Sequence, residues 1–187
     1  DRVDSGAVAF LLLIETLAET LGLPTDPHPE WLNVVAFVEE DVPGFEVMYL
    51  VRATHRQATD LRMRLGRIGD SVVVVAGAEQ LWHVHVHLEH PAHALSELEM
   101  SQVCVRRLDA PRRAVALVAE TCAPELLEPL AEAGAVAVLR AGRRTLARAA
   151  VDGGSRDVVV MPSSVRAAQH AEAAGQDESV LADRIRV

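Results

Sequence analysis

The sequence predicts a mixed α/β and α+β protein: an N-terminal helix, a ferredoxin-like βαββαβ domain, and then a parallel-sheet α/β region. Three observations lead to this expectation. Apolar residues recur at helical spacing over residues 8–21, alternate with other residues over 45–52 and 81–88, and form short continuous runs after residue 111. The hydrophobic period therefore changes twice along the chain, and each change indicates a different class of structure.

The N-terminal helix is expected to be capped by Ser5 and to end at Gly22. Residues 23–29 follow and contain three prolines, which cannot continue a helix and favour extended backbone. We interpret this segment as a linker between domains. A short amphipathic piece over residues 31–40 then leads to the first strand.

The central part has the hydrophobic pattern of a split βαβ arrangement. Its expected elements are a strand at 45–52, a helix at 55–68, strands at 71–76 and 81–88, a helix at 91–100 and a strand at 102–108. The turn at residues 77–80 makes the middle two strands a hairpin. In this topology the first and third strands are antiparallel neighbours, and helices cover one face of the sheet only.

The last part alternates between buried strands and helices, which predicts a parallel sheet. Its expected elements are strands at 114–119, 135–139 and 157–161, helices at 124–133 and 145–151, a helix carrying His170, and a strand starting at 184. The predicted domains are therefore residues 1–29, 30–110 and 111–187.

Composition excludes several classes of protein. The 187 residues include 18 basic side chains, all arginine, against 27 acidic ones, and the net charge of −9 argues against nucleic acid as a partner. Cys104 and Cys122 are the only cysteines, so we expect no disulfide framework and a cytoplasmic location. The longest apolar run, residues 7–14, is too short for membrane insertion.

The most informative segment is residues 81–88, in which three histidines alternate with apolar residues. Period two sends His83, His85 and His87 to one face of the strand and the apolar residues, including Trp82, to the other. The apolar side chains should then lie beneath the helices. A row of imidazoles is left on the open face.

Two further side chains are expected on the histidine side. The antiparallel register brings Glu46 of the first strand towards His85 and His87, and alternation on the last strand directs Cys104 to the same face. Imidazole, carboxylate and thiol groups on one surface suit zinc binding or acid-base catalysis. The structural alternative is an ordinary polar sheet face, and the residues alone leave these interpretations open.

Other features have simpler structural explanations. Ser163 and Ser164 follow a parallel strand, where α/β proteins bind ligands, but serine there is also a common helix N-cap. Cys122 has no base near it in the sequence, so we expect it to be structural. Gly142 and the glycines at 153–154 lack the spacing of a phosphate-binding loop.

Three segments stand in a fixed order along the chain: FEVMYLV at residues 45–51, GDSVVVV at 69–75 and LWHVHVH at 81–87. This series resembles the central domain of the fatty acid kinase A family, long labelled dihydroxyacetone kinase-like. The opening VDSG at residues 3–6 is similar to the start of the last helix of that family's nucleotide-binding domain. Residues 113–138 resemble the entry into its C-terminal region, which is DegV-like.

The resemblance implies a cytoplasmic kinase that phosphorylates a fatty acid held by a separate carrier protein, giving an acyl phosphate for phospholipid synthesis. In that family the N-terminal domain binds ATP and Mg²⁺, which implies cofactor-binding roles for Asp4 and Gly6. The central domain forms the homodimer and contributes a cysteine and two histidines to catalysis. The histidines fall on His85 and His87, whereas Glu46 replaces the cysteine and is a poorer nucleophile than a thiolate.

The C-terminal region of that family docks the fatty-acid-binding carrier protein. By this resemblance the chain lacks most of the nucleotide-binding domain, so by itself it is expected to be inactive. The competing hypothesis is a non-catalytic ferredoxin-like module for dimerisation or ligand sensing. A metal-binding enzyme is a third hypothesis.

Overall fold

The computed structural model describes residues 5–25, 44–111, 114–152, 155, 157–175 and 185–186. The chain divides into two compact units, Asp1–Glu40 and Asp41–Val187. The predicted amphipathic piece at 31–40, and the part of the predicted linker beyond residue 25, lie outside the described residues.

The first unit contains the predicted N-terminal helix, α1 (Ser5–Thr20). The helix ends as expected, because Gly22 takes a positive φ of 70° and closes the last turn. The backbone amides of Gly22 and Leu23 each donate to a carbonyl of that turn, at 2.9 Å. Neither α1 nor any other helix in the described part of the chain combines the length and apolar character needed to cross a membrane.

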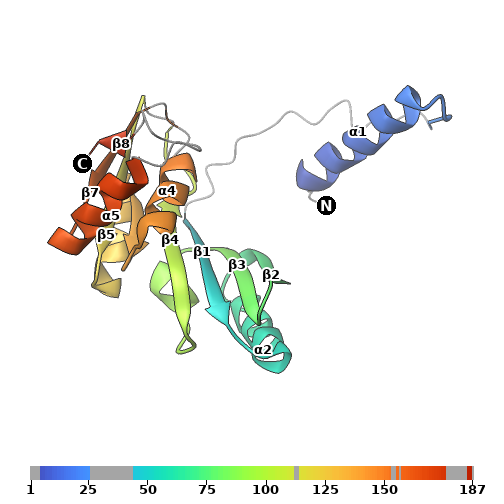
Figure 1. The fold of residues 1–187 in the computed structure, drawn as a ribbon. Helices are drawn as coiled ribbons and strands as arrows, with labels where there is room; N and C mark the ends of the chain where they lie inside the picture. Colours follow the sequence, from blue (N-terminus) through green and yellow to red (C-terminus); the bar gives the residue numbers. More distant parts are fainter. Residues whose placement is uncertain are drawn as a thin grey trace. The chain divides into compact units, whose positions relative to one another are not determined.

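The second unit is built on one mixed sheet with the strand order β2-β3-β1-β4-β6-β5-β7-β8 (Figure 1). The strands are β1 (Phe45–Arg52), β2 (Asp70–Ala76), β3 (Leu81–Leu88), β4 (Met100–Arg107), β5 (Val115–Thr121), β6 (Val136–Leu139), β7 (Asp157–Met161) and β8 (Ile185–Arg186). The helices are α2 (His55–Leu65), α3 (Leu127–Glu132), α4 (Arg143–Asp152) and α5 (Val165–Gly175), with 3₁₀ turns η2 (Pro91–Ala94) and η3 (Pro124–Leu126). Fold class is thus mixed α/β, as predicted.

Strands β1 to β4 pair antiparallel in the spatial order of a ferredoxin-like sheet, and β5 to β8 pair parallel. The two halves are joined because β4 pairs antiparallel with β6. The predicted boundary between residues 110 and 111 therefore falls within a continuous sheet, and both halves belong to one compact unit. The three domains remain a prediction about segments that fold independently.

Helices cover the two faces of this sheet unequally. Helices α2 and α3 pack on one face, against the apolar sides of β1, β3 and β4. Helices α4 and α5 pack on the other face, over β4, β6, β5 and β7. No helix in the described residues packs on this second face over β1, β2 and β3. We call this uncovered area the open face; its side chains are Glu46, Met48, Leu50, Val73, Val75, His83, His85 and His87.

Most predicted elements of the central part are present, and β1 and β3 have their predicted bounds. Val84 and Val86 are buried on the helix-covered face, as expected from the alternation in β3. Trp82 shares that face but is only half-buried, and its indole N–H donates to the Ala53 carbonyl at 2.9 Å.

The predicted helix at residues 91–100 is wrong, because only the short turn η2 forms there. Leu95 already has extended backbone, with ψ 146°, and Met100 begins β4. Helix α3, which follows β5 in the chain, packs Leu127 and Ala131 into the same core as α2. The second helix on this face therefore comes from the parallel half of the sheet.

Candidate functional site

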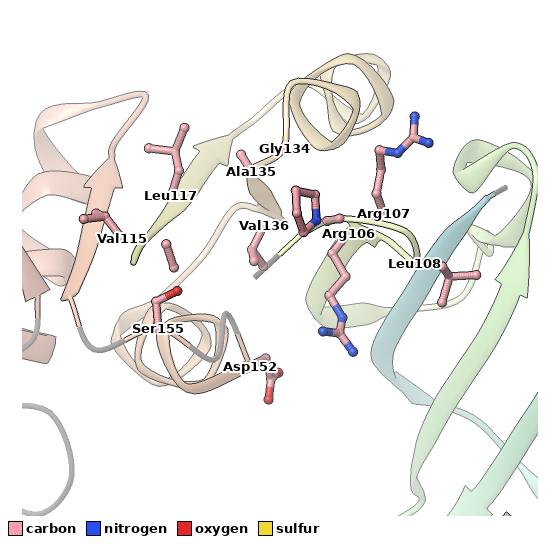
Figure 2. Close-up of a pocket in the computed structure, with 13 residues that line it drawn as sticks. Arg106, Arg107, Leu108, Val115, Leu117, Gly134, Ala135, Val136, Asp152 and Ser155 are labelled. Atoms are coloured by element: carbon pink, nitrogen blue, oxygen red, sulfur yellow. The ribbon is translucent and has the colours of Figure 1, made fainter. Parts of the chain in front are cut away.

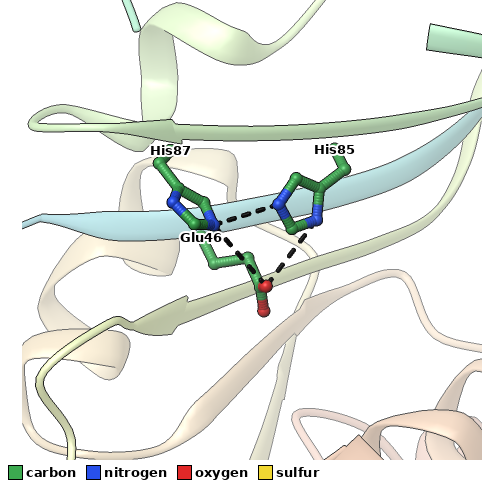
Figure 3. Close-up of side chains that lie close together, drawn as sticks. All are labelled: Glu46, His85 and His87. Atoms are coloured by element: carbon green, nitrogen blue, oxygen red, sulfur yellow. Dashed lines mark hydrogen bonds and ion pairs between the residues drawn. The ribbon is translucent and has the colours of Figure 1, made fainter. Parts of the chain in front are cut away.

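Glu46, His85 and His87 come together on the open face, as the strand alternation predicted (Figure 3). His85 Nε2 and His87 Nε2 are 3.0 Å apart, a hydrogen bond in which the donor depends on the tautomers. Glu46 Oε1 lies 3.6 Å from His85 Nδ1 and 3.8 Å from His87 Nε2. We call these three residues the histidine–glutamate cluster. Register explains it, since Glu46 of β1 pairs directly with His87 of β3.

The carboxylate of Glu46 is buried and is held by Arg106 on β4, whose Nε donates to Glu46 Oε2. Burial alone would raise the pKa of Glu46, but the hydrogen bond and charge of Arg106, with smaller contributions from His85 and His87, lower it overall. Glu46 is therefore ionised at neutral pH. With Oε2 bound to Arg106, Oε1 is the oxygen that faces the histidines.

His85 is half-buried, with 31% of its side chain exposed. Burial lowers the pKa of His85 and outweighs the opposing effect of the Glu46 charge, while His87 and Arg106 lower it further. The imidazole is consequently neutral at pH 7. A neutral imidazole has one bare nitrogen, which can accept a proton or bind a metal ion.

A β-bulge at the start of β2 adds a fourth side chain to this group. Asp70 pairs with His87 and Val73 with His85, so two residues of β2 oppose one of β3, and Ser71 has a positive φ of 51°. The bulge turns Asp70 to the open face, where its Oδ1 lies 3.8 Å from His87 Nδ1. His87 is thus flanked by carboxylates on both ring nitrogens.

Gly69 allows β2 to approach β3 closely at this point. A Cβ built on Gly69 would lie 2.4 Å from the His87 carbonyl oxygen and 2.8 Å from a methyl carbon of Val86. Neither distance is compatible with a side chain, so only glycine fits here without moving the backbone. Its neighbour Asp70 is positioned by this contact.

A second bulge, in β4, decides the environment of Cys104. Ser101 pairs with Leu50 and Cys104 with Met48, and the intervening Gln102 has a positive φ of 54°. Cys104 faces the histidine side as predicted, but it is buried in the core beneath α4. Burial raises the pKa of Cys104 to about 12, so it remains a protonated thiol and is not part of the cluster.

Two residues of the site were missed from the sequence, Arg106 and Asp70. Arg106 was within reach, because the alternation that directs Cys104 to the histidine side also directs Arg106 there, opposite Glu46. Asp70 was not, since a regular β2 would place it on the opposite face. Its position depends on the bulge.

Two pockets border the cluster. One, of about 160 Å³, runs along the open face beside His85 and is closed on one side by Arg148 of α4. The other, of about 270 Å³, lies at the start of β5 and β6, and Figure 2 shows Arg106 and Arg107 pointing to opposite sides of it. Both guanidinium groups of this second pocket are already paired, Arg106 with Glu46 and Arg107 with Asp109.

The serines predicted near a parallel strand form a separate contact. Glu120, buried at the end of β5, accepts hydrogen bonds at Oε2 from Ser163 N–H at 3.0 Å and from its hydroxyl at 2.5 Å. Ser164 caps α5, accepting from Ala167 N–H at 3.1 Å. Cys122 is exposed, with its sulfur 3.9 Å from both Glu120 and Ser163. These contacts satisfy a buried carboxylate and a helix end, which accounts for them structurally.

The residues expected to bind a cofactor lie in the first unit. Gly6 is in the first turn of α1, and Asp4 lies outside the described residues. Their role in binding nucleotide remains a prediction. Within the described residues, a group able to hold a metal ion is formed by Glu46, His85 and His87, whose potential ligand atoms all lie within 4.8 Å of one another.

Comparison with known proteins identifies one segment. Residues 42–103 match the family model of the fatty acid kinase A-like middle domain. The match includes the whole histidine–glutamate cluster and Asp70, and it ends before Arg106. A search of curated proteins found no match.

Proposed function

Since residues 42–103 are a fatty acid kinase A-like middle domain, we propose that this chain is part of a kinase that phosphorylates a fatty acid held by a carrier protein. The carboxylate oxygen of the fatty acid attacks the γ-phosphorus of ATP, the bond to ADP breaks, and an acyl phosphate is formed. The acyl phosphate would supply phospholipid synthesis in the cytoplasm.

One observation carries this proposal: the matched segment brings Glu46, His85 and His87 together on an uncovered sheet face. A carboxylate buried next to a neutral, partly exposed imidazole is an arrangement found at catalytic sites more often than on ordinary sheet surfaces. Arg106 holds Glu46 in place, as expected for a functional group that must keep one geometry.

The contribution of the cluster is electrostatic. A fatty acid is ionised at neutral pH, because its carboxyl group resembles that of glutamate, with an ordinary pKa of about 4.3. No base is therefore required to activate it. The main requirement of phosphoryl transfer is to position the reactants and balance negative charge on the transferring group. Glu46 orients the imidazoles, and the histidines act at the phosphoryl group.

The remaining components lie elsewhere. ATP and Mg²⁺ would be bound by an N-terminal domain to which α1, with Asp4 and Gly6, belongs. The parallel half of the sheet, which follows the matched segment, would dock the fatty-acid-binding carrier protein. The 187 residues alone should accordingly show no phosphoryl transfer.

The test uses the complete kinase with ATP, fatty acid and carrier. His85→Ala or His87→Ala should lower turnover roughly a hundredfold, the usual effect of removing one group that stabilises transition-state charge. The free energy of unfolding should change by about 1 kcal/mol or less, because neither imidazole belongs to a hydrophobic core. His83→Ala is the matched control, since His83 lies on the same strand and face but outside the cluster.

Retention of full turnover by both variants would reduce the cluster to a polar sheet face. The chain would then be better described as a non-catalytic module for dimerisation or ligand sensing. Unfolding of the histidine variants would instead assign these residues a structural role.

We also propose that the chain forms a homodimer through β2. This strand ends the sheet, and Val73 and Val75 expose 45% and 50% of their surface. Pairing of β2 with its copy would satisfy the free backbone groups of the edge and leave the histidines accessible.

Sedimentation should therefore give a dimer for the wild type at micromolar concentration. Val73→Lys with Val75→Lys should give a monomer, because charged side chains on an edge strand oppose further pairing. A monomeric wild type would rule out this interface.

A further inference from the structure

The histidine–glutamate cluster also has the donor set of a transition-metal site. We propose that Glu46, His85 and His87 bind one divalent metal ion of the zinc type. The inference rests on the proposed function only for the role of that ion, since the geometry and its test concern binding alone.

Distances among the candidate ligand atoms fit a tetrahedral centre. Atoms bound to zinc at about 2.0 to 2.1 Å lie roughly 3.3 Å from one another in that geometry. His85 Nε2 and His87 Nε2 are 3.0 Å apart, and His87 Nε2 is 3.8 Å from Glu46 Oε1. These separations lie on either side of the tetrahedral value, so small side-chain rotations are sufficient to form the site.

The chemistry of the donors selects the class of metal. Two imidazoles and one carboxylate are the ligands of many catalytic zinc sites, in which the fourth position is left for water or substrate. Magnesium and calcium prefer a larger number of oxygen ligands. The cluster offers two nitrogens and one free oxygen, which favours Zn²⁺, or Co²⁺ as its spectroscopic substitute, over Mg²⁺.

Neighbouring groups already hold two of the ligands in suitable orientations. Asp70 Oδ1 lies 3.8 Å from His87 Nδ1, which leaves His87 Nε2 towards the cluster. Metal-binding histidines commonly donate their other ring N–H to a carboxylate in this way. Arg106 binds Glu46 Oε2 and leaves Oε1 for the metal. The β2 bulge that turns Asp70 towards His87 thus has a function in this arrangement.

Access and role are consistent with a catalytic ion. His85 and His87 keep 31% and 24% of their side chains exposed, so a cation and a substrate oxygen can reach them from the open face. A metal ion bound there would act as a Lewis acid on phosphoryl or carboxylate oxygens. It would supply the charge balance that the proposed phosphoryl transfer requires.

The test is titration of the full 187-residue chain, free of any affinity tag, with ZnCl₂ by calorimetry and with CoCl₂ by visible absorption. We expect one ion per chain and the intense absorption bands of tetrahedral Co²⁺. Glu46→Gln, His85→Gln and His87→Gln should each weaken Zn²⁺ binding more than a hundredfold. Asp70→Asn should weaken it by roughly ten- to a hundredfold, the usual effect of losing a partner of a metal-bound histidine.

His83→Gln is the control and should bind Zn²⁺ as the wild type does. MgCl₂ should give no comparable binding. The proposal is overturned if the wild type shows no tetrahedral Co²⁺ bands, or if folded variants of the three ligands bind Zn²⁺ unchanged. Loss of kinase turnover in the same variants without Zn²⁺ binding by the wild type would leave the proposed function standing and remove the metal. Zn²⁺ binding with full turnover in those variants would do the reverse.

Discussion

At the scale of single residues, position 46 determines what the cluster can do. A glutamate there is buried, ionised and bound to Arg106, so it serves as a fixed charge or a ligand and not as a soft nucleophile. The thiol nearest to the open face, Cys104, does not replace it, because it is covered by α4. Catalysis through a covalent thiol intermediate is therefore not available to this cluster.

The two cysteines should differ in their reaction with iodoacetamide. Cys104 is buried and its pKa is raised to about 12, so about one thiol in ten thousand is ionised at pH 8, whereas Cys122 is exposed. At that pH we expect alkylation of Cys122 alone, measured by mass spectrometry of the digested protein. Cys104 should become modified only after urea is added. Equal labelling of both thiols in the folded protein would contradict the packing of α4 on β4.

At the scale of elements, two β-bulges shape the open face. The bulge in β2 directs Asp70 to His87, and the bulge in β4 allows both Ser101 and Cys104 to face the side of the cluster. Bulges redirect side chains in this way near active sites. Their presence on both sides of β1 and β3 explains how a regular antiparallel pair gains neighbours that strand alternation alone would not provide.

Gly69→Ala should disrupt the first of these bulges. The added methyl group meets the His87 carbonyl, so we expect about 1 to 3 kcal/mol of destabilisation, the usual cost of overpacking. Urea unfolding measures this change, and turnover of the complete kinase should fall because Asp70 moves away from His87. Gly142→Ala is the control, since a Cβ there meets nothing within 4 Å. An unchanged stability for Gly69→Ala would mean that β2 is not held against β3 as described.

At the scale of the whole molecule, the ferredoxin-like half depends on the parallel half. Helix α3 places Leu127 and Ala131 in the core on the helix-covered face, and β6 pairs with β4. The segment that matches the middle domain therefore shares both its core and its sheet with the residues that follow. Separation of the two functions along the chain does not require separation of the two folds.

A chain ending at residue 110 should consequently be less stable than residues 41–187. It loses Leu127 from the core and leaves β4 unpaired on one side, and exposing one buried leucine costs about 2 kcal/mol by itself. Residues 41–187 should unfold in a single transition in urea, followed by circular dichroism. If residues 41–110 prove equally stable, the predicted boundary at 110 and 111 separates two independent domains after all.

The sequence by itself determined the strands β1, β3 and β7, the antiparallel pairing of β1 with β3, and the convergence of Glu46 with His85 and His87. These depend on period-two alternation and local turn signals, which are properties of short segments.

Only the tertiary structure decided the presence of Asp70 beside His87, the burial of Cys104 and the junction of the two halves through β4 and β6. It also replaced the predicted helix at 91–100 by packing α3 on the same core. Each of these depends on a bulge or on contacts between residues far apart in the chain. No local pattern encodes them, because their free energy comes from packing partners that a single segment does not contain.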